Sequence, residues 1–251
     1  MAATEEPIVL RREGAVAVIS FNRPDKHNAA NDALDAGLWA ILRELHADDD
    51  IRCAILRGEG KSFSSGRDME ELGQRPGGIS DLDFIAQGHA GTELFLSSPV
   101  PIIAALKGWV IGGSFERALL CDMRIAAEDT RMMLPEVAHG VIPDSAGIAR
   151  LFQMCGHGVA ADLALTGRVM DAEEALRHGV VSRIVPTDEL DDAVMEVAQK
   201  IAGSSRLAVR MARHTLGELA TPPVIATLHR ELLAQTVVMA GDEFRSARGR
   251  D

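Results

Sequence analysis

Two hydrophobic patterns alternate along this chain. Residues 8–21 are rich in β-branched and small apolar side chains, and the turn at Glu13-Gly14 divides them into two strands of a hairpin. Residues 31–46 place leucines and isoleucine three and four apart, which is typical of a helix that begins after a cap at Asn31. A further short strand is predicted at 51–57.

The alternation continues through the middle of the chain. A capping pattern at Ser80 predicts a helix to about residue 97, and the apolar run "VPIIAAL" predicts a strand buried on both faces. A helix over 113–120 and a strand over 123–127 follow. Beyond residue 188 the periodicity is helical, and the "TPP" at 221–223 is expected to open a helix. The pattern predicts an α/β core over residues 1–188 and a helical region over 189–251.

Composition narrows the class of protein. The 251 residues carry a formal charge of −11, which argues against sequence-independent binding to nucleic acid or to anionic membranes. No stretch approaches the ~20 apolar residues that span a bilayer, and the first ten residues carry acids where a secretory signal carries basic residues. The three cysteines have no CxxC spacing. We expect a soluble cytoplasmic protein without a metal site or a membrane partner.

The segment "GEGKSFSSGRD" contains a Gly-Lys-Ser triplet but is not a phosphate-binding loop. Such a loop needs a glycine five residues before the triplet, where this chain has Ile55, and a helix directly after it. Neither condition is met. The small residues beside Gly66 instead allow a ligand to approach main-chain N–H groups closely.

Two glutamates stand in apolar surroundings. In "VIGGSFERALL" paired glycines precede a helix, whose positive end stabilises an oxyanion, and Glu116 lies one turn inside. Glu136 follows a proline in "MMLPEVAHGVIP". Each is a costly place for a charge unless the carboxylate is solvated or paired. From helix chemistry alone the solvated alternative is favoured for Glu116.

Several ordered blocks resemble the signature of a known family. They are "FNRPDKHNAAN", "FSSGRDMEEL" and "PVPIIAALKGWVIGGSFERALLCDMRIAAEDTRMMLPEVAHGVIP". At this spacing the chain is similar to the enoyl-CoA hydratase/isomerase, or crotonase, superfamily over roughly residues 8–190. The resemblance implies an α/β fold with a core of repeated ββα turns, a C-terminal helical trimerisation region, and an acyl-coenzyme A thioester as ligand.

The resemblance also implies roles for particular residues. The oxyanion hole falls on the main-chain N–H groups of Ser65 and Gly113, and one such donor is typically worth ~3–4 kcal/mol of barrier. Glu116 would activate the water that attacks C3, and Glu136 would deliver the proton to C2. The other expected substrate-binding residues are Arg23, Lys26, Ser64, Gly66, Arg67, Asp68 and Gly112.

Three of these residues have open alternatives. Arg23 and Lys26 match contacts to the coenzyme A nucleotide, but for Arg23 a solvated turn is an equally good interpretation. Asp68 either orders its loop or contacts the ligand.

The chain departs from the pattern of the hydratases at two places. Asp144 and Ser145 stand where Gly-Ala-Gly-Gly is usual. Asp144 is a possible catalytic group, as in relatives that use an aspartate nearby as proton shuttle or nucleophile, but a cap for a helix beginning near Ser145 is the favoured alternative. Arg117 follows Glu116 directly and is expected to point outward.

The expected function is that of a 2-enoyl-CoA hydratase in fatty acid metabolism. The alternatives are a Δ3,Δ2-enoyl-CoA isomerase and a noncatalytic acyl-CoA-binding member of the fold. No separate cofactor is expected, because coenzyme A enters as part of the substrate. The expected assembly is a homotrimer or a dimer of trimers.

Overall fold

The computed structural model describes residues 6–248, so the predicted regions 1–188 and 189–251 extend beyond it at the two ends. The chain begins with the predicted hairpin of β1 (Ile8–Glu13) and β2 (Val16–Phe21). Helix α1 (Asp32–Ala47) follows, and the Asn31 side chain accepts a hydrogen bond from the amide of Leu34 at 3.0 Å. The predicted cap of this helix is therefore confirmed.

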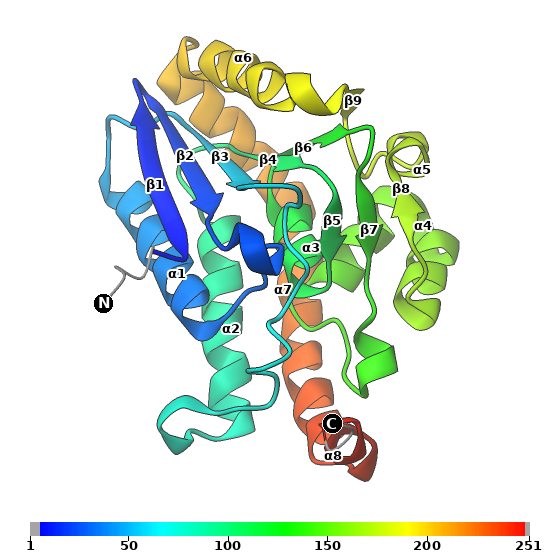
Figure 1. Ribbon diagram of the computed structural model, residues 1–251. Coiled ribbons are helices and arrows are strands. Elements are labelled where there is room, and N and C mark those ends of the chain that lie inside the picture. The colour runs from blue at the N-terminus through cyan, green and yellow to red at the C-terminus, as the bar shows by residue number, and fades with distance from the viewer. Residues whose placement is uncertain (1–5, 249–251) are drawn as a thin grey trace.

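The core is a six-stranded sheet with the order β1-β2-β3-β4-β6-β9 (Figure 1). Its later strands are β3 (Cys53–Gly58), β4 (Ile102–Leu106), β6 (Met123–Ala127) and β9 (Arg183–Val185). Within this sheet, over residues 6–248, the β1–β2 pair is antiparallel and the other pairs are parallel. A second sheet contains β5 (Trp109–Ile111), β7 (Arg131–Met133) and β8 (Met170–Asp171). Because β4 leads to β5 and then to α3 (Gly113–Leu120), the predicted ββα turn is confirmed.

The strand-to-strand turn between β4 and β5 depends on Gly108. Its φ is +52°, a region that favours glycine, and a Cβ there would lie 2.2 Å from the carbonyl oxygen of Lys61. The absent side chain lets the segment after β3 lie against β5, where Ser64 forms a parallel bridge with Val110. The segment after β3 and the start of β5 therefore lie side by side.

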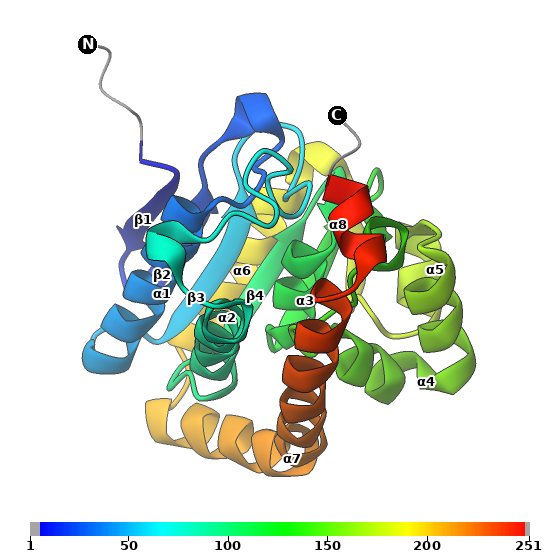
Figure 2. The ribbon, with the colours of Figure 1, turned by 90° about the horizontal axis from the view of Figure 1, so that it is seen from below.

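Alternate residues of the large sheet face two different layers. Val16, Val18, Cys53 and Ile55 pack with the apolar stripe of α6 (Leu190–Ala202). Ala17, Ile19, Phe21 and Leu56 face the other side, where α1, α2 (Asp81–Leu96) and α3 lie. Figure 2 shows the sheet between α6 and these helices.

The remaining helices are α4 (Gly147–Thr166), α5 (Ala172–Arg177), α7 (Arg206–Met239) and α8 (Asp242–Arg248). Short 3₁₀ turns occur at Pro24–Lys26, Pro76–Gly78, Glu136–His139 and Thr187–Glu189. Among residues 6–248, no helix is both long enough and apolar enough to cross a membrane.

The prediction that the prolines at 222 and 223 open a helix is wrong. They lie inside α7, which begins after Ser205, whose side chain accepts from the amide of Ala208. The φ of proline suits a helix, and burial of Val224 and Leu228 in the main core anchors the segment that follows. Packing of this stripe against the core outweighs the loss of two main-chain donors.

Candidate active site

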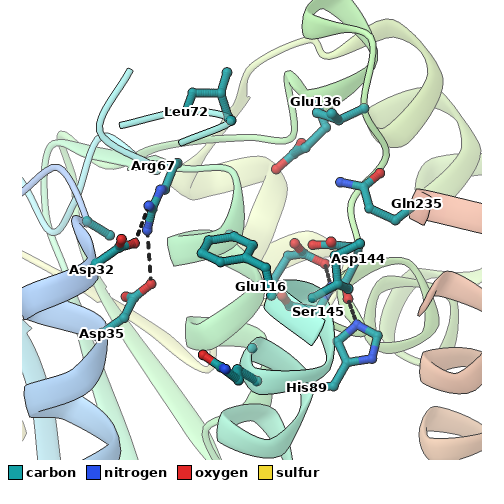
Figure 3. A pocket seen from close by; sticks show the side chains of 18 of the residues that line it. Asp32, Asp35, Arg67, Leu72, His89, Glu116, Glu136, Asp144, Ser145 and Gln235 are labelled. Atoms are coloured by element: carbon teal, nitrogen blue, oxygen red, sulfur yellow. Dashed lines mark hydrogen bonds and ion pairs between the residues drawn. The ribbon is translucent and has the colours of Figure 1, made fainter. Parts of the chain in front are cut away.

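A cavity of about 500 Å³ opens beside the ends of β5 and β7, two strands of the second sheet. Its walls come from α1, the segment after Gly66, α2, the first turn of α3, the segment between β7 and α4, and α7. In Figure 3, Glu116, Glu136, Asp144 and Gln235 lie on one side of it, and Arg67 lies on the other with Asp32 and Asp35.

Glu116 lies at the bottom of the cavity and is only 1% exposed. One carboxyl oxygen, Oε1, accepts hydrogen bonds from the amides of Ser145 at 2.9 Å and Gly147 at 2.8 Å. A Cβ at Gly147 would lie 2.5 Å from Cγ of Glu116, so a glycine is required there for the carboxyl to fit. Burial, followed by the neighbouring charges of Glu136, Asp144 and Glu231, raises the pKa of Glu116 well above its ordinary value.

Glu136 reaches the same cavity from the segment after β7. Its Oε2 is buried and has no hydrogen-bond partner within the described part of the chain. Burial raises the pKa of Glu136 to about 7. A Cβ at Gly112, which has a φ of +58°, would lie 2.9 Å from Glu136 Oε1, so this glycine leaves room for the carboxyl. The structure therefore brings Glu116 and Glu136 together.

Asp144 does not cap α4, so the favoured structural interpretation of this residue is wrong. The cap position is Ala146, in a left-handed conformation with a φ of +71°, and no side chain of its own closes the helix. Asp144 instead lines the cavity, where burial raises its pKa to about 6. Its carbonyl oxygen lies 2.6 Å from His89 Nε2, which must donate because a carbonyl only accepts.

The expected oxyanion donor Ser65 does not fit the structure. Its amide already donates to the carbonyl oxygen of His27 at 2.9 Å, on the side of the segment away from the cavity. Ser64 is fully buried; its hydroxyl donates to the carbonyl of Asn28 at 2.7 Å and accepts from the Ser114 hydroxyl at 2.8 Å. The predictions for both serines are wrong, because the Ser65 amide and the Ser64 hydroxyl already have partners within the protein and neither residue lines the cavity.

The amide of Arg67, two residues after Ser65, has no acceptor among the described residues. Ala30 accepts from the amide of Asp68 at 2.8 Å and donates to the carbonyl of Gly66 at 2.7 Å, so the intervening N–H of Arg67 points away from Ala30. Gly66 lies directly against Ile111, because a Cβ on it would be 3.0 Å from the Ile111 carbonyl oxygen.

Gly113 begins α3 two residues after Ile111, and its amide is one of the unpaired donors at a helix start. Among the described residues, neither the Arg67 amide nor the Gly113 amide has an acceptor. Both residues line the cavity.

The wall opposite the glutamates is charged. Arg67 pairs with Asp32 and lies 3.4 Å from Asp35. Arg117 pairs with Asp35 at 2.8 Å and stacks over Trp39, with 5.3 Å from the guanidinium carbon to the ring centroid. The expectation that Arg117 points outward is therefore wrong, since the ion pair and the aromatic ring draw it back over the cavity wall.

Arg23, Lys26 and Asp68 form a separate cluster that does not line this cavity. Asp68 is buried and pairs with Arg23 at 2.9 Å, and Lys26 lies 3.8 Å from it. These contacts favour the loop-ordering alternative for Asp68. The roles of Arg23 and Lys26 toward coenzyme A, and of Gly66 and Gly112 toward a ligand, stay predictions.

Three polar residues near the site were not expected: His89 from α2, and Glu231 and Gln235 from α7. Gln235 Oε1 accepts from the amide of Ile142 at 3.0 Å, and Glu231 Oε2 accepts from the amide of Ala146 at 2.9 Å. Both residues continue the stripe of Val224 and Leu228 at helical spacing. Polar residues at positions of a buried stripe are the signal that would have identified them.

Stacked ββα turns with two buried carboxyl groups beside free main-chain amides define a protein of the crotonase superfamily. The sequence also matches the family model for enoyl-CoA hydratase/isomerase, over residues 11–250. The chain belongs to this family.

Two relatives are named for different activities. A probable enoyl-CoA hydratase of Rhizobium meliloti is 38% identical over 212 residues, which cover 84% of this chain and 81% of that protein. A carnitinyl-CoA dehydratase of Salmonella enteritidis is 37% identical over 205 residues, which cover 81% of this chain and 77% of that protein.

Solved structures share the fold. An enoyl-CoA hydratase/isomerase from Mycobacterium paratuberculosis superimposes with a TM-score of 0.90 at 26% identity, over 98% of each chain. An enoyl-CoA hydratase from Bacillus anthracis gives a TM-score of 0.78 at 32% identity, over 94% of this chain and 90% of that one.

The raised pKa values predict that the protein loses stability as pH rises. Between the ordinary glutamate value of 4.5 and about 7, the folded chain binds more protons at Glu136 than the unfolded chain does. The free energy of unfolding therefore falls through this window. Urea unfolding at a series of pH values measures this fall. Between about pH 5 and pH 8, the free energy of unfolding of Glu136→Gln should fall by roughly 1–2 kcal/mol less than that of the wild type.

The control for this titration is Glu196→Gln, an exposed glutamate on α6. Its free energy of unfolding should fall with pH as much as that of the wild type. A Glu136→Gln curve parallel to that of the wild type would contradict the assigned pKa shift.

Proposed function

We propose that this protein is a 2-enoyl-CoA hydratase, which adds water across the α,β double bond of an acyl-coenzyme A thioester. The observation that supports this most is the pair of buried carboxyl groups, Glu116 and Glu136, on one cavity with two unpaired amides. The relatives named as probable enoyl-CoA hydratases point to the same reaction. In this proposal coenzyme A enters with the substrate and no separate cofactor takes part.

The thioester carbonyl is held by the amides of Arg67 and Gly113. Both N–H groups lie on the cavity and lack acceptors within the described part of the chain, so a bound oxygen restores their hydrogen bonds. Negative charge builds up on this oxygen when water adds to C3, because the intermediate is an enolate. Preorganised donors stabilise that charge more than they stabilise the neutral carbonyl.

This assignment predicts the geometry of a bound substrate analogue. In a crystal structure with a saturated acyl-coenzyme A, the carbonyl oxygen should lie within hydrogen-bond distance, about 3 Å, of both amides. A carbonyl oxygen that accepts from neither amide would contradict it.

The two glutamates divide the acid and base work through their different partners. Glu116 Oε1 accepts two main-chain hydrogen bonds, which favour its ionised form. Glu136 keeps a buried oxygen without a partner, which favours its neutral form. Hydration needs one proton on the pair, and we assign this proton to Glu136. Glu116 takes a proton from the attacking water, and Glu136 gives its proton to C2 on the same face.

Substitution of either glutamate by glutamine tests this mechanism. Glu116→Gln removes the base and Glu136→Gln removes the acid, so each should lower kcat for hydration of crotonyl-CoA by about 10²–10⁴-fold. The assay follows loss of the conjugated double bond from the same starting concentration of thioester for each variant. Glu196→Gln on the exposed face of α6 is the matched control and should retain wild-type kcat.

Other outcomes would replace the proposal. Conversion of a 3-enoyl-CoA to the 2-enoyl isomer without incorporation of ¹⁸O from labelled water would indicate an isomerase. Binding of thioesters across chain lengths without turnover would indicate a noncatalytic member of the fold. Near-unchanged hydration by Glu136→Gln would remove the acid role from that residue.

We also propose that the protein assembles as a homotrimer or a dimer of trimers. Large apolar side chains stay exposed on the long helix α7, among them Leu219 at 78% and Val237 at 73%, and on α4, with Leu165 at 73%. Apolar surface of this kind is typical of an interface between subunits. Sedimentation velocity should give the mass of three or six chains, and the mass of one chain at micromolar concentration would contradict the assembly.

A further inference from the structure

Three consecutive amides at the start of α4 are held by two carboxyl groups. Glu116 Oε1 accepts from Ser145 and Gly147, at 2.9 and 2.8 Å, and Glu231 Oε2 accepts from Ala146 between them, at 2.9 Å. Ala146, which is in a left-handed conformation with a φ of +71°, thus donates to a different carboxyl group from the residues on either side of it. The two acids therefore accept hydrogen bonds from the same short turn.

Glu231 has no part in the chemistry described so far. It belongs to α7, is 5% exposed, and does not line the cavity. Its other oxygen, Oε1, is buried without a hydrogen-bond partner among residues 6–248. A buried carboxyl group in this state destabilises the fold relative to an apolar side chain. Its presence therefore points to a role that an apolar side chain could not fill.

We propose that Glu231 is a positioning residue for Glu116: it fixes the 145–147 turn that carries the hydrogen bonds of the Glu116 carboxyl, and it places negative charge beside that carboxyl. The inference rests on the proposed hydratase function only where turnover is measured. The hold acts through the amide of Ala146, and the charge acts through space, so different substitutions separate the two effects.

The charge is effective because the surroundings supply little compensation. Glu136 and Asp144 add negative charge beside Glu116 from the segment between β7 and α4. On α2, burial lowers the pKa of His89, which favours its neutral form. The nearest cation on α3, Arg117, is paired with Asp35. Burial raises the pKa of Glu231 itself to about 7, so Glu231 is charged above about pH 7, and there its charge raises the pKa of Glu116.

Two variants test the two effects on hydration of crotonyl-CoA. Glu231→Gln keeps an acceptor for Ala146 but removes the charge. Its kcat at about pH 8 should stay within about threefold of wild type, while the acid limb of the pH profile moves down by about half a pH unit or more, because Glu116 ionises more easily. Glu231→Met removes the acceptor as well, and should lower kcat about tenfold or more with KM nearly unchanged.

The matched control is Glu218→Gln on the exposed face of the same helix, where the side chain of Glu218 is 73% exposed. It should leave both kcat and the pH profile unchanged. Thermal melting of each variant establishes that the fold persists.

A readout without turnover separates this inference from the proposed function. The infrared carbonyl band of protonated carboxyl groups contains a contribution from Glu116, identified by its loss in Glu116→Gln. In Glu231→Gln this contribution should disappear at lower pH than in the wild type. If no thioester is hydrated, the proposed function fails while this titration still decides the role of Glu231. An unshifted band, or equal pH profiles for wild type and Glu231→Gln, would overturn the inference.

Discussion

The site depends on keeping several carboxyl groups close together and out of water. Each such group destabilises the folded chain when it ionises, unless donors meet it. Here the donors are main-chain amides at the start of α4, which need no counter-charge and do not change their own protonation. Glu116 receives two of them, while Glu136 keeps one buried oxygen without a hydrogen-bond partner in the described part of the chain, so the two acids have unlike surroundings. That difference is what acid and base chemistry on one substrate face requires.

The fold meets this requirement by ending several turns at one place. Each ββα turn leaves its second strand beside that of the previous turn, so the starts of α3 and of the segment after β7 lie next to the Gly66–Arg67 chain. Glycines stand where two of these segments approach the carboxyl groups: Gly112 beside Glu136, and Gly147 beside Glu116. Side chains at either position would displace the acid that each one faces.

Much of the fold could be predicted from the sequence, because its signals are local. Hydrophobic period and caps such as Asn31 and Ser80 identify the early strands and helices. The two glutamates could be singled out because acids within apolar runs are costly. The main-chain donors were harder to predict. Whether the amide of residue 65 or 67 is free depends on pairing with His27 and Ala30, which lie far earlier in the sequence and which no local pattern specifies. Arg117 was misjudged for the same reason, since its direction is decided by Asp35 and Trp39 on another helix.

The contribution of α7 has a consequence for the order in which the protein is made. Glu231 and Gln235 hold the 141–147 segment from a helix near the carboxyl end of the described chain, whereas every other wall of the cavity precedes residue 148. During translation the sheet and the first helices emerge long before this brace. A nascent chain therefore has its strands and both cavity glutamates outside the ribosome while the turn that orients Glu116 is still unsupported, and the acids reach their final arrangement only after α7 has been made.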